Sequence, residues 1–256
     1  MQESPLYRNF YYPLNVLLHV LTLEEGSVQH LHYGLFERPD EPIGTAQERA
    51  SGRLFGQLPS PPARVLDVGS GLGANLNRLV KMGYDATGIT PDADQIAMIR
   101  SRYGDLPVRC ERFEDVRETF DIAMFHESSQ YIDAEALFAK AEQIAPALLV
   151  LDEFAMRPVE GLHRYDTFLA AAERHRFTKV MDEDVSMMAA PTIEYFNARL
   201  PRFRQRLIDD IGVSSVQIDE LIASGARYRD RYRNGDYGYR FLRFARIDEA
   251  AQRPAA

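Results

Sequence analysis

The segment Val65–Gly73, with the sequence VLDVGSGLG, constrains the fold of this 256-residue chain more than any other segment. A short apolar run typical of a buried strand ends in closely spaced glycines, and a helical pattern follows directly. Glycine lets the backbone adopt positive φ and approach a ligand closely. Ligands of open α/β sheets bind at the carboxyl ends of strands, where this loop lies. The segment therefore predicts a ligand site built on Gly69, Gly71 and Gly73.

Strand and helix patterns continue to alternate after this loop. Strands are expected at residues 64–68, 85–89, 108–112, 120–125, 147–151, 177–181 and 237–245. Helices are expected between them at residues 74–82, from Thr90 onward, and at 133–143, 165–176, 192–210 and 215–232. This alternation predicts an α/β fold with a Rossmann-like, mostly parallel seven-stranded sheet and helices on both faces.

The N-terminal part has a different pattern. An amphipathic helix is expected at residues 14–23, and Thr45–Glu48 (TAQE) is a capping box that predicts a second helix running to about residue 58. Pro59-Ser60-Pro61-Pro62 then breaks the chain. We therefore expect an N-terminal helical cap at 1–62, the main domain at 63–247 and a disordered tail at 248–256. An insertion at about 182–235 is expected either to form a lid over a pocket or to add packing to the sheet.

Composition excludes several classes of protein. The formal net charge of -8 argues against a nucleic-acid backbone as the main partner. The single cysteine, Cys110, cannot form an intrachain disulfide and is typical of a reducing compartment. No signal peptide is evident, and no apolar stretch approaches the roughly 20 residues that a membrane span needs. We expect a cytoplasmic protein without a membrane or nucleic-acid partner, as a monomer or homodimer.

Two kinds of ligand fit the glycine loop. Gly69, Gly71 and Ala74 satisfy the dinucleotide-binding pattern G-x-G-x-x-G/A. Asp67, however, would repel a pyrophosphate, whereas it suits the cationic sulfonium and ammonium groups of S-adenosylmethionine. Thr90 also stands where a nicotinamide enzyme places an acid for the ribose. The residues favour S-adenosylmethionine as cofactor. A nicotinamide- or nucleotide-dependent oxidoreductase and a non-catalytic cofactor-binding module remain the alternatives.

The glycine-loop sequence resembles the first motif of class I S-adenosylmethionine-dependent methyltransferases. The segment 88–95, GITPDADQ, is similar to the G-[IV/L]-T-L-S-x-x-Q segment of the branch that contains cyclopropane synthases and the sterol and geranyl-diphosphate C-methyltransferases. Pro91 and Asp92 replace its usual Leu-Ser. The resemblance implies that the cofactor's methionine end, ribose and adenine contact these residues: Asp67, Gly69, Ser70, Gly71, Gly73, Thr90, Gln95 and Phe113. Thr90 also suits a helix N-cap, and Arg112 replaces the acid usual beside the adenine.

The segment 126–133, HESSQYID, resembles the N-E-S-T-x-Y-V-D segment of prenyl-diphosphate C-methyltransferases. Glu127 matches the glutamate that is thought to stabilise a carbocation or accept its proton in that family. Methyl transfer depends largely on positioning, and a carboxylate in a partly dry pocket can add either form of catalysis. The alternative is that Glu127 caps a turn or binds the cofactor's ammonium. His126 is a candidate base or cofactor contact, and Gln130 and Tyr131 are candidate substrate contacts.

His32-Tyr33-Gly34 resembles the N-terminal segment that covers the cofactor in the same branch. The resemblance places Tyr33 near the methionine moiety and in the catalytic site, and a core position is its alternative. His32 is a candidate substrate contact, although the pattern favours a histidine satisfied on the surface or in the core. No histidine has metal-ligand spacing with a carboxylate or with Cys110, so no metal site is predicted. Mg²⁺ would enter only with a diphosphate substrate.

Arginine and tyrosine are concentrated in the last third of the chain. The arginines are Arg199, Arg202, Arg204, Arg206, Arg227, Arg229, Arg231 and Arg233. They suit a pocket for an anionic substrate, a nucleic-acid surface, or solvated helix faces paired with nearby acids. Taken together, the sequence predicts a methyltransferase that methylates carbon, nitrogen or oxygen of a small molecule in secondary-metabolite biosynthesis. Methylation of nucleic acid and cyclopropanation of lipids are less favoured.

Overall fold

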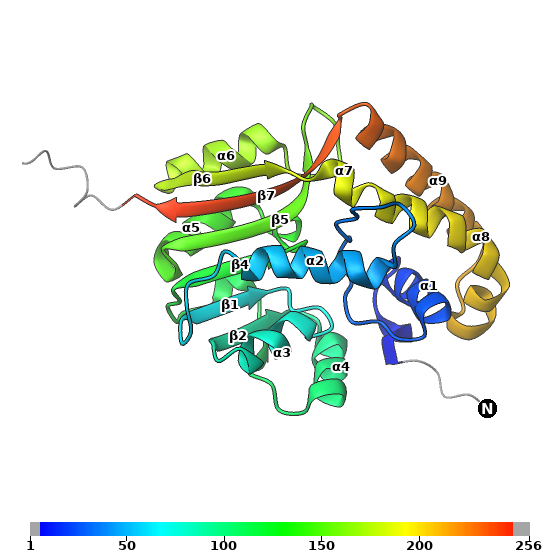
Figure 1. The fold of residues 1–256 in the computed structure, drawn as a ribbon, viewed down its shortest axis with the longest axis horizontal. Helices are drawn as coiled ribbons and strands as arrows, with labels where there is room; N and C mark the ends of the chain where they lie inside the picture. The colour runs from blue at the N-terminus through cyan, green and yellow to red at the C-terminus, as the bar shows by residue number, and fades with distance from the viewer. Residues whose placement is uncertain (1–5, 248–256) are drawn as a thin grey trace, which may run out of the picture.

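A seven-stranded sheet forms the centre of the molecule (Figure 1). The structure is a computed structural model that describes residues 6–247. The strands are β1 (Arg64–Val68), β2 (Asp85–Thr90), β3 (Val108–Cys110), β4 (Ile122–His126), β5 (Ala147–Ala155), β6 (Phe177–Asp184) and β7 (Tyr237–Arg246). Their order across the sheet is β3-β2-β1-β4-β5-β7-β6. The expected α/β fold and mostly parallel sheet are confirmed, and β7 runs antiparallel to both β5 and β6.

The side of the sheet to which the chain adds strands changes at β1 and β4. From β1 the chain builds outward to β2 and β3, and it then returns to the other side of β1 to add β4. The loops after β1 and β4 diverge at this point, which leaves a crevice at the carboxyl edge of the sheet. This crevice holds the glycine loop and the segment that begins at His126.

Two layers of helices cover the sheet. The face packed on α2 (Ile43–Phe55), α3 (Ala74–Lys81) and α4 (Ala93–Tyr103) buries one apolar cluster. The opposite face buries another against α5 (Ala134–Ile144) and α6 (Tyr165–Arg174). Strands covered on both faces explain why β1, β4 and β5 read as nearly continuous apolar runs rather than alternating ones.

A helical layer lies beyond the carboxyl edge of the sheet (Figure 1). It consists of the short turn η1 (Leu6–Asn9), α1 (Leu14–Glu25), α7 (Ser186–Ala189), α8 (Pro191–Ile211) and α9 (Ser215–Arg233). Val16 and Val20 of α1 pack with Leu200 and Leu207 of α8. The two long helices α8 and α9 occupy the interval expected for the insertion, between β6 and β7. Two further turns, η2 (Phe113–Asp115) and η3 (Ser129–Tyr131), follow β3 and β4.

Two helix starts differ from the sequence prediction. The helix α2 begins at Ile43, before the expected capping box, and no side chain caps it. The helix α4 begins at Ala93, and Asp92 rather than Thr90 is its N-cap, because the Asp92 carboxylate accepts from the amides of Asp94 and Gln95. Thr90 instead ends β2. The tail expected at 248–256 lies outside the described residues. Within residues 6–247, no helix is long and apolar enough to cross a membrane.

Candidate functional site

A cavity of about 620 Å³ opens at the carboxyl ends of β1, β2 and β4. This volume lies within the range of small-molecule sites in proteins. Most of the predicted site residues line it: His32, Asp67, Gly69, Ser70, Gly71, Thr90, Gln95, Phe113, His126, Glu127 and Tyr131. Three predicted residues, Tyr33, Gly73 and Gln130, are not in its lining. The fold therefore brings residues from the glycine loop, from β2 and from the HESSQYID segment to one cavity.

The glycine loop is shaped by close contacts on both sides. Gly69, Gly71 and Gly73 have φ values of 75°, 52° and 80°, which favour glycine. A Cβ on Gly69 would lie 2.6 Å from the Cβ of Ser128, so this glycine lets β1 approach the segment after β4. A Cβ on Gly73 would lie 2.9 Å from Ile99 Cγ1 on α4. Gly73 thus serves packing between the loop and α4 rather than the cavity surface.

Asp67 is the carboxylate at the tip of β1. It is 2% exposed, and its Oδ2 atom has no hydrogen-bond partner among the described residues. Burial raises the pKa of Asp67 to about 6, and a hydrogen bond with Ser70 opposes the rise. A buried carboxylate oxygen without a partner is costly unless a ligand or water satisfies it. Its place beside the glycine loop fits the ammonium of an amino-acid-bearing cofactor.

Thr90 and Gln95 form a second polar point in the cavity. The Thr90 hydroxyl donates to Gln95 Oε1 over 2.9 Å, and both side chains are buried. This bond orients the glutamine and leaves its amide nitrogen as a donor for a ligand hydroxyl. Phe113 is also buried and packs edge-on against Phe125. Arg112 is mostly exposed and pairs with Glu114 at 3.3 Å.

Three histidines, His30, His32 and His126, form what we call the histidine stack. The rings of His32 and His126 lie 3.5 Å apart between centroids, and those of His30 and His32 lie 4.7 Å apart. His32 Nδ1 donates to the carbonyl of Tyr33 at 2.9 Å, and His32 Nε2 accepts from the hydroxyl of Ser51 at 3.2 Å. Burial, followed by the neighbouring histidines, lowers the pKa of His32 well below its usual value. Both ring nitrogens of a neutral His32 are therefore occupied, which leaves no polar atom for a substrate.

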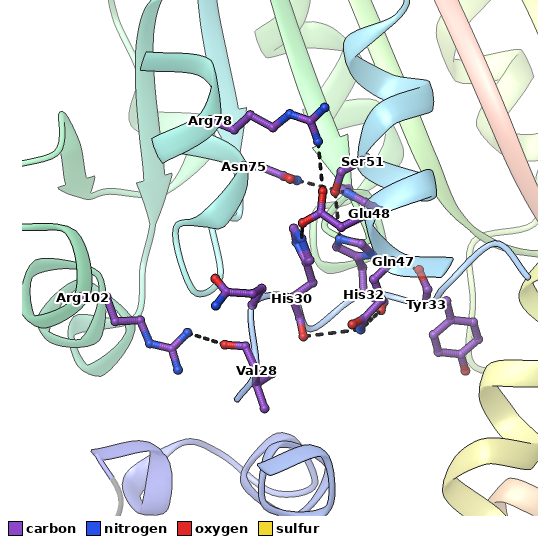
Figure 2. A network of polar contacts seen from close by, with 12 residues as sticks. Val28, His30, His32, Tyr33, Gln47, Glu48, Ser51, Asn75, Arg78 and Arg102 are labelled. Atoms are coloured by element: carbon purple, nitrogen blue, oxygen red, sulfur yellow. Dashed lines mark hydrogen bonds and ion pairs between the residues drawn. The ribbon is translucent and has the colours of Figure 1, made fainter. Parts of the chain in front are cut away.

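The segment that carries His30 and His32 is held by side chains from three helices (Figure 2). From α2, Gln47 donates to the carbonyl of His32 at 2.7 Å and Glu48 bonds to His30 Nε2 at 2.8 Å. Arg102 of α4 donates to the carbonyl of Val28 at 2.6 Å. Residues Gln47 and Glu48, expected to cap a helix, thus fix this segment over the cavity instead. Arg78 of α3 joins the network through Glu48 at 3.0 Å.

Glu127 follows β4 directly and has a φ of 54°, which is unusual for a residue other than glycine. Its Oε1 accepts from the backbone amide of Tyr33 at 2.6 Å and from the hydroxyl of Tyr239 at 2.5 Å. No described residue bonds to its Oε2. Burial raises the pKa of Glu127 well above its usual value, the hydrogen bond from Tyr239 opposes the rise, and the charge of Glu153 adds to it. Strained backbone at a half-buried acid with a perturbed pKa is typical of functional sites.

Tyr33 and Gln130 lie away from the positions predicted for them. The Tyr33 ring stacks in parallel on Tyr239 with centroids 5.7 Å apart, and Figure 2 shows the ring turned away from the histidines. The amide of Gln130 donates to Asp152 at 3.4 Å, outside the cavity. Of Tyr33, Gln130 and Tyr131, Tyr131 alone lines the cavity. It is 69% exposed, and its hydroxyl lies 3.3 Å from that of Tyr11.

Sequence reasoning missed Glu153, Tyr232 and Tyr239. Glu153 lies on β5 opposite Tyr239 on β7, and its Oε1 accepts from the Tyr232 hydroxyl at 2.6 Å. The one available signal was the pair Asp152-Glu153 in an otherwise apolar strand. Both tyrosines belong to the tyrosine-rich last third of the chain, but no local pattern ties them to these acids, because Tyr239 reaches Glu127 from β7 and Tyr232 reaches Glu153 from α9.

The arginines of the last third are largely paired with acids on helix surfaces. Arg229 and Arg233 lie 4.0 and 3.4 Å from Glu194, and Arg206 lies 2.8 Å from Asp210. None of these arginines lines the cavity at the glycine loop. The residues 6–247 contain no group of three or more His, Cys, Asp or Glu side chains arranged to hold a metal ion.

Comparisons with known proteins agree with this geometry. Residues 66–145 match a methyltransferase domain family. No curated protein matches the chain by sequence. Among solved structures, the [4+2]-cyclase SpnF is 19% identical, with a TM-score of 0.76 over 95% of this chain and 97% of its own.

Two further structures have similar folds. The cyclopropane synthase MmaA2 from Mycobacterium tuberculosis is 16% identical, with a TM-score of 0.76 over 96% of this chain and 100% of its own. A geranyl diphosphate C-methyltransferase from Streptomyces coelicolor, in complex with Mg²⁺, geranyl diphosphate and S-adenosylhomocysteine, is 14% identical, with a TM-score of 0.66 over 91% and 97%. None of the comparisons supports an oxidoreductase.

Proposed function

We propose that the chain is a class I S-adenosylmethionine-dependent methyltransferase, because residues 66–145 match a methyltransferase domain family, and that it methylates a small molecule at carbon, nitrogen or oxygen in a secondary-metabolite pathway. The observation that carries the proposal is the unpartnered Oδ2 of buried Asp67 beside a glycine loop in a cavity of about 620 Å³. A cationic amino-acid end satisfies this oxygen, whereas a pyrophosphate would not.

The proposed cofactor contacts follow from the lining of the cavity. Asp67 and the backbone of Gly69–Gly71 hold the methionine end, and the free amide of Gln95, oriented by Thr90, binds the ribose. Phe113 lies against the adenine. When bound, S-adenosylmethionine supplies an electrophilic methyl group on a positively charged sulfur. The chain's own task is to align the acceptor and to exclude water.

Glu127 is proposed to assist the transfer. Its Oε1 is held by Tyr33 and Tyr239, and its Oε2 is free to contact an acceptor. A carboxylate with a raised pKa is a stronger base near neutral pH than an ordinary glutamate. It can take a proton from an acceptor hydroxyl or amine, or stabilise positive charge that develops on an alkene carbon. The methylated atom depends on which acceptor atom lies beside this oxygen.

The remaining lining suggests the character of the acceptor. Tyr11, Leu14, Tyr131 and Ile132 offer aromatic and apolar surface near Glu127. Among the described residues, Arg112 is the one Lys or Arg in the lining, and it is paired with Glu114. A diphosphate needs cationic partners, so we propose an uncharged or cationic acceptor. The protein is proposed to act in the cytoplasm as a monomer or homodimer, without membrane or nucleic-acid partners. The N-terminal cap (1–62) and the insertion (about 182–235) are proposed to close over the acceptor.

Two measurements test the function. Calorimetric titration should show saturable binding of S-adenosylmethionine and S-adenosylhomocysteine, with no binding of NAD(H). Incubation with methyl-labelled S-adenosylmethionine and a panel of phenols, amines and isoprenoid alkenes should then transfer label to one class, and E127Q should lose the transfer while still binding S-adenosylhomocysteine. Saturable NAD(H) binding without binding of either sulfur cofactor would contradict the proposal.

A further inference from the structure

Glu127 belongs to a group that we call the carboxylate–tyrosine cluster, in which Glu153 and Tyr239 are buried and Glu127, Tyr33 and Tyr232 are half-buried. Its members come from the end of β4, from β5, from the segment before α2, from α9 and from β7. They are separated by up to 206 residues of sequence, from position 33 to position 239. Only Glu127 lines the cavity at the glycine loop.

The tyrosines hold the two carboxylates. The backbone amide of Tyr33 donates to Glu127 Oε1 at 2.6 Å, and the Tyr33 side chain lies close enough to Glu153 to lower the pKa of that carboxyl. Tyr239 donates to Glu127 at 2.5 Å, and Tyr232 donates to Glu153 at 2.6 Å. Each carboxylate is thus held by neutral donors, and its environment includes the other carboxylate.

Within residues 6–247, no lysine or arginine forms an ion pair with Glu127 or Glu153. Facing Glu127 from β5 are Glu153 and Asp152, and Tyr131 faces it from η3. The Asp152 carboxylate is already satisfied by the amide and hydroxyl of Ser129 at 2.9 and 2.7 Å. The neighbouring His126 is kept neutral, because burial lowers its pKa well below the usual value. The local field at Glu127 is therefore neutral to negative.

This environment disfavours ionisation of both acids. Burial raises the pKa of Glu153 to about 7, with the charge of Asp152 adding to the rise and the hydroxyls of Tyr232 and Tyr33 opposing it. The pKa of Glu127 is raised by the same causes. Two coupled carboxylates titrate as a unit, and the first charge opposes the second. A positive charge placed in the adjoining cavity shifts the balance toward the ionised form.

We propose that Glu127 and Glu153 retain a shared proton while the cavity lacks a cation, and that they release it to solvent when the sulfonium form of the cofactor binds. The inference rests on the proposed function and deepens it. It makes Glu153, Tyr33, Tyr232 and Tyr239 positioning residues that set the charge of Glu127. Its consequence is that the base becomes available only in the presence of the methyl donor.

The test compares two ligands that differ by one charge. S-adenosylmethionine carries the sulfonium and S-adenosylhomocysteine does not, whereas their amino-acid ends are alike, so any proton exchanged at Asp67 cancels in the difference. Titration calorimetry at pH 7 in two buffers of different ionisation enthalpy gives the protons released by each ligand. We expect S-adenosylmethionine to release up to about one proton more than S-adenosylhomocysteine.

Variants test which residue releases the proton. E127Q should abolish the difference. E153Q should move the difference in proton release to lower pH, because loss of the neighbouring charge lowers the pKa of Glu127. Y239F should move the difference to higher pH, because loss of a hydrogen bond to the Glu127 carboxylate raises that pKa. E114Q, a change in an acid of the same cavity lining, is the matched control and should leave the difference unchanged.

The outcomes separate the two proposals. Equal proton release by the two ligands in the unchanged protein, or a full difference that survives in E127Q, overturns the inference while leaving the proposed function intact. If neither ligand binds, the proposed function fails and the inference fails with it. Retained S-adenosylhomocysteine affinity in each variant shows that the change has not simply unfolded the site.

Discussion

The histidine stack and the carboxylate–tyrosine cluster lie on opposite sides of the segment 30–33, and they handle buried titratable groups in opposite ways. His32 uses both of its nitrogens within the protein, whereas Glu127 uses one oxygen and leaves the other unbonded. Burial keeps both groups neutral, the histidine by lowering its pKa and the acid by raising it. His32 supports the segment, whereas the unbonded oxygen of Glu127 is available for chemistry. His126 Nε2, also in the stack, has no hydrogen-bond partner among the described residues.

The largest expected effect is a difference in methyl-transfer activity between a variant of Glu127 and a variant of His126. E127Q should reduce methyl transfer by about two to four orders of magnitude, the usual contribution of a general acid or base. H126N, on the opposite side, should reduce methyl transfer by less than about tenfold, because the asparagine retains a partner for the Asn75 amide nitrogen, which lies 3.2 Å from His126 Nδ1. Single-turnover rates at saturating cofactor measure both. Equal losses in the two variants would contradict the division of roles.

The next effect is on stability against pH. Because the folded-state pKa of Glu153 is raised from 4.5 to about 7, its contribution is fully present below pH 4.5 and is lost as the pH rises through 7. The wild type should lose about 3 kcal/mol of unfolding free energy over this window relative to E153Q. Urea denaturation of both proteins between pH 4.5 and 8 measures the difference. A constant difference across this range would show that Glu153 ionises normally.

The contribution of His32 to stability should change with pH in the opposite direction. The folded-state pKa of His32 lies below 6.5, so its contribution is present above pH 6.5 and is lost as the pH falls. H32L at pH 7 leaves the Ser51 hydroxyl and the Tyr33 carbonyl without partners and should cost about 2 kcal/mol. H32L should also remove the loss of unfolding free energy that the wild type shows as the pH falls below 6.5. Chemical denaturation of both proteins at pH 5.5 and 7 tests both expectations.

The smallest effect is expected outside both groups. Tyr131 is exposed, and its hydroxyl makes a 3.3 Å contact with that of Tyr11. Y131F should change stability by less than about 0.5 kcal/mol, and it should alter the KM for the acceptor more than the affinity for S-adenosylhomocysteine. A large loss of cofactor affinity would mean that the cavity mouth holds the cofactor rather than the acceptor.

How far the sequence predicts each part depends on how local the interactions are. The glycine loop and the strand pattern are short-range features, and the sequence predicts both. The start of α4 was misplaced because Asp92 competes with Thr90 as N-cap. The TAQE segment satisfies the local rule for a capping box, but Gln47 and Glu48 bond to the histidine segment instead.

The carboxylate–tyrosine cluster has no local signature. It depends on β7 returning antiparallel beside β5, which places Tyr239 opposite Glu153. The orientation of the Tyr33 ring could not be predicted from the sequence either. The motif indicates that its backbone lies near the cavity, but it does not determine the direction of the ring. Here the ring packs on Tyr239, and the backbone amide is the group that contacts Glu127.

A crystal structure of the protein with S-adenosylhomocysteine tests the central claim most directly. We expect the ligand in the cavity at the glycine loop, with its ammonium near Asp67 Oδ2 and its ribose hydroxyls at Gln95. The claim would be contradicted by crystals in which this cavity stays empty at saturating ligand, or in which a nucleotide pyrophosphate occupies the loop at Gly69–Gly73.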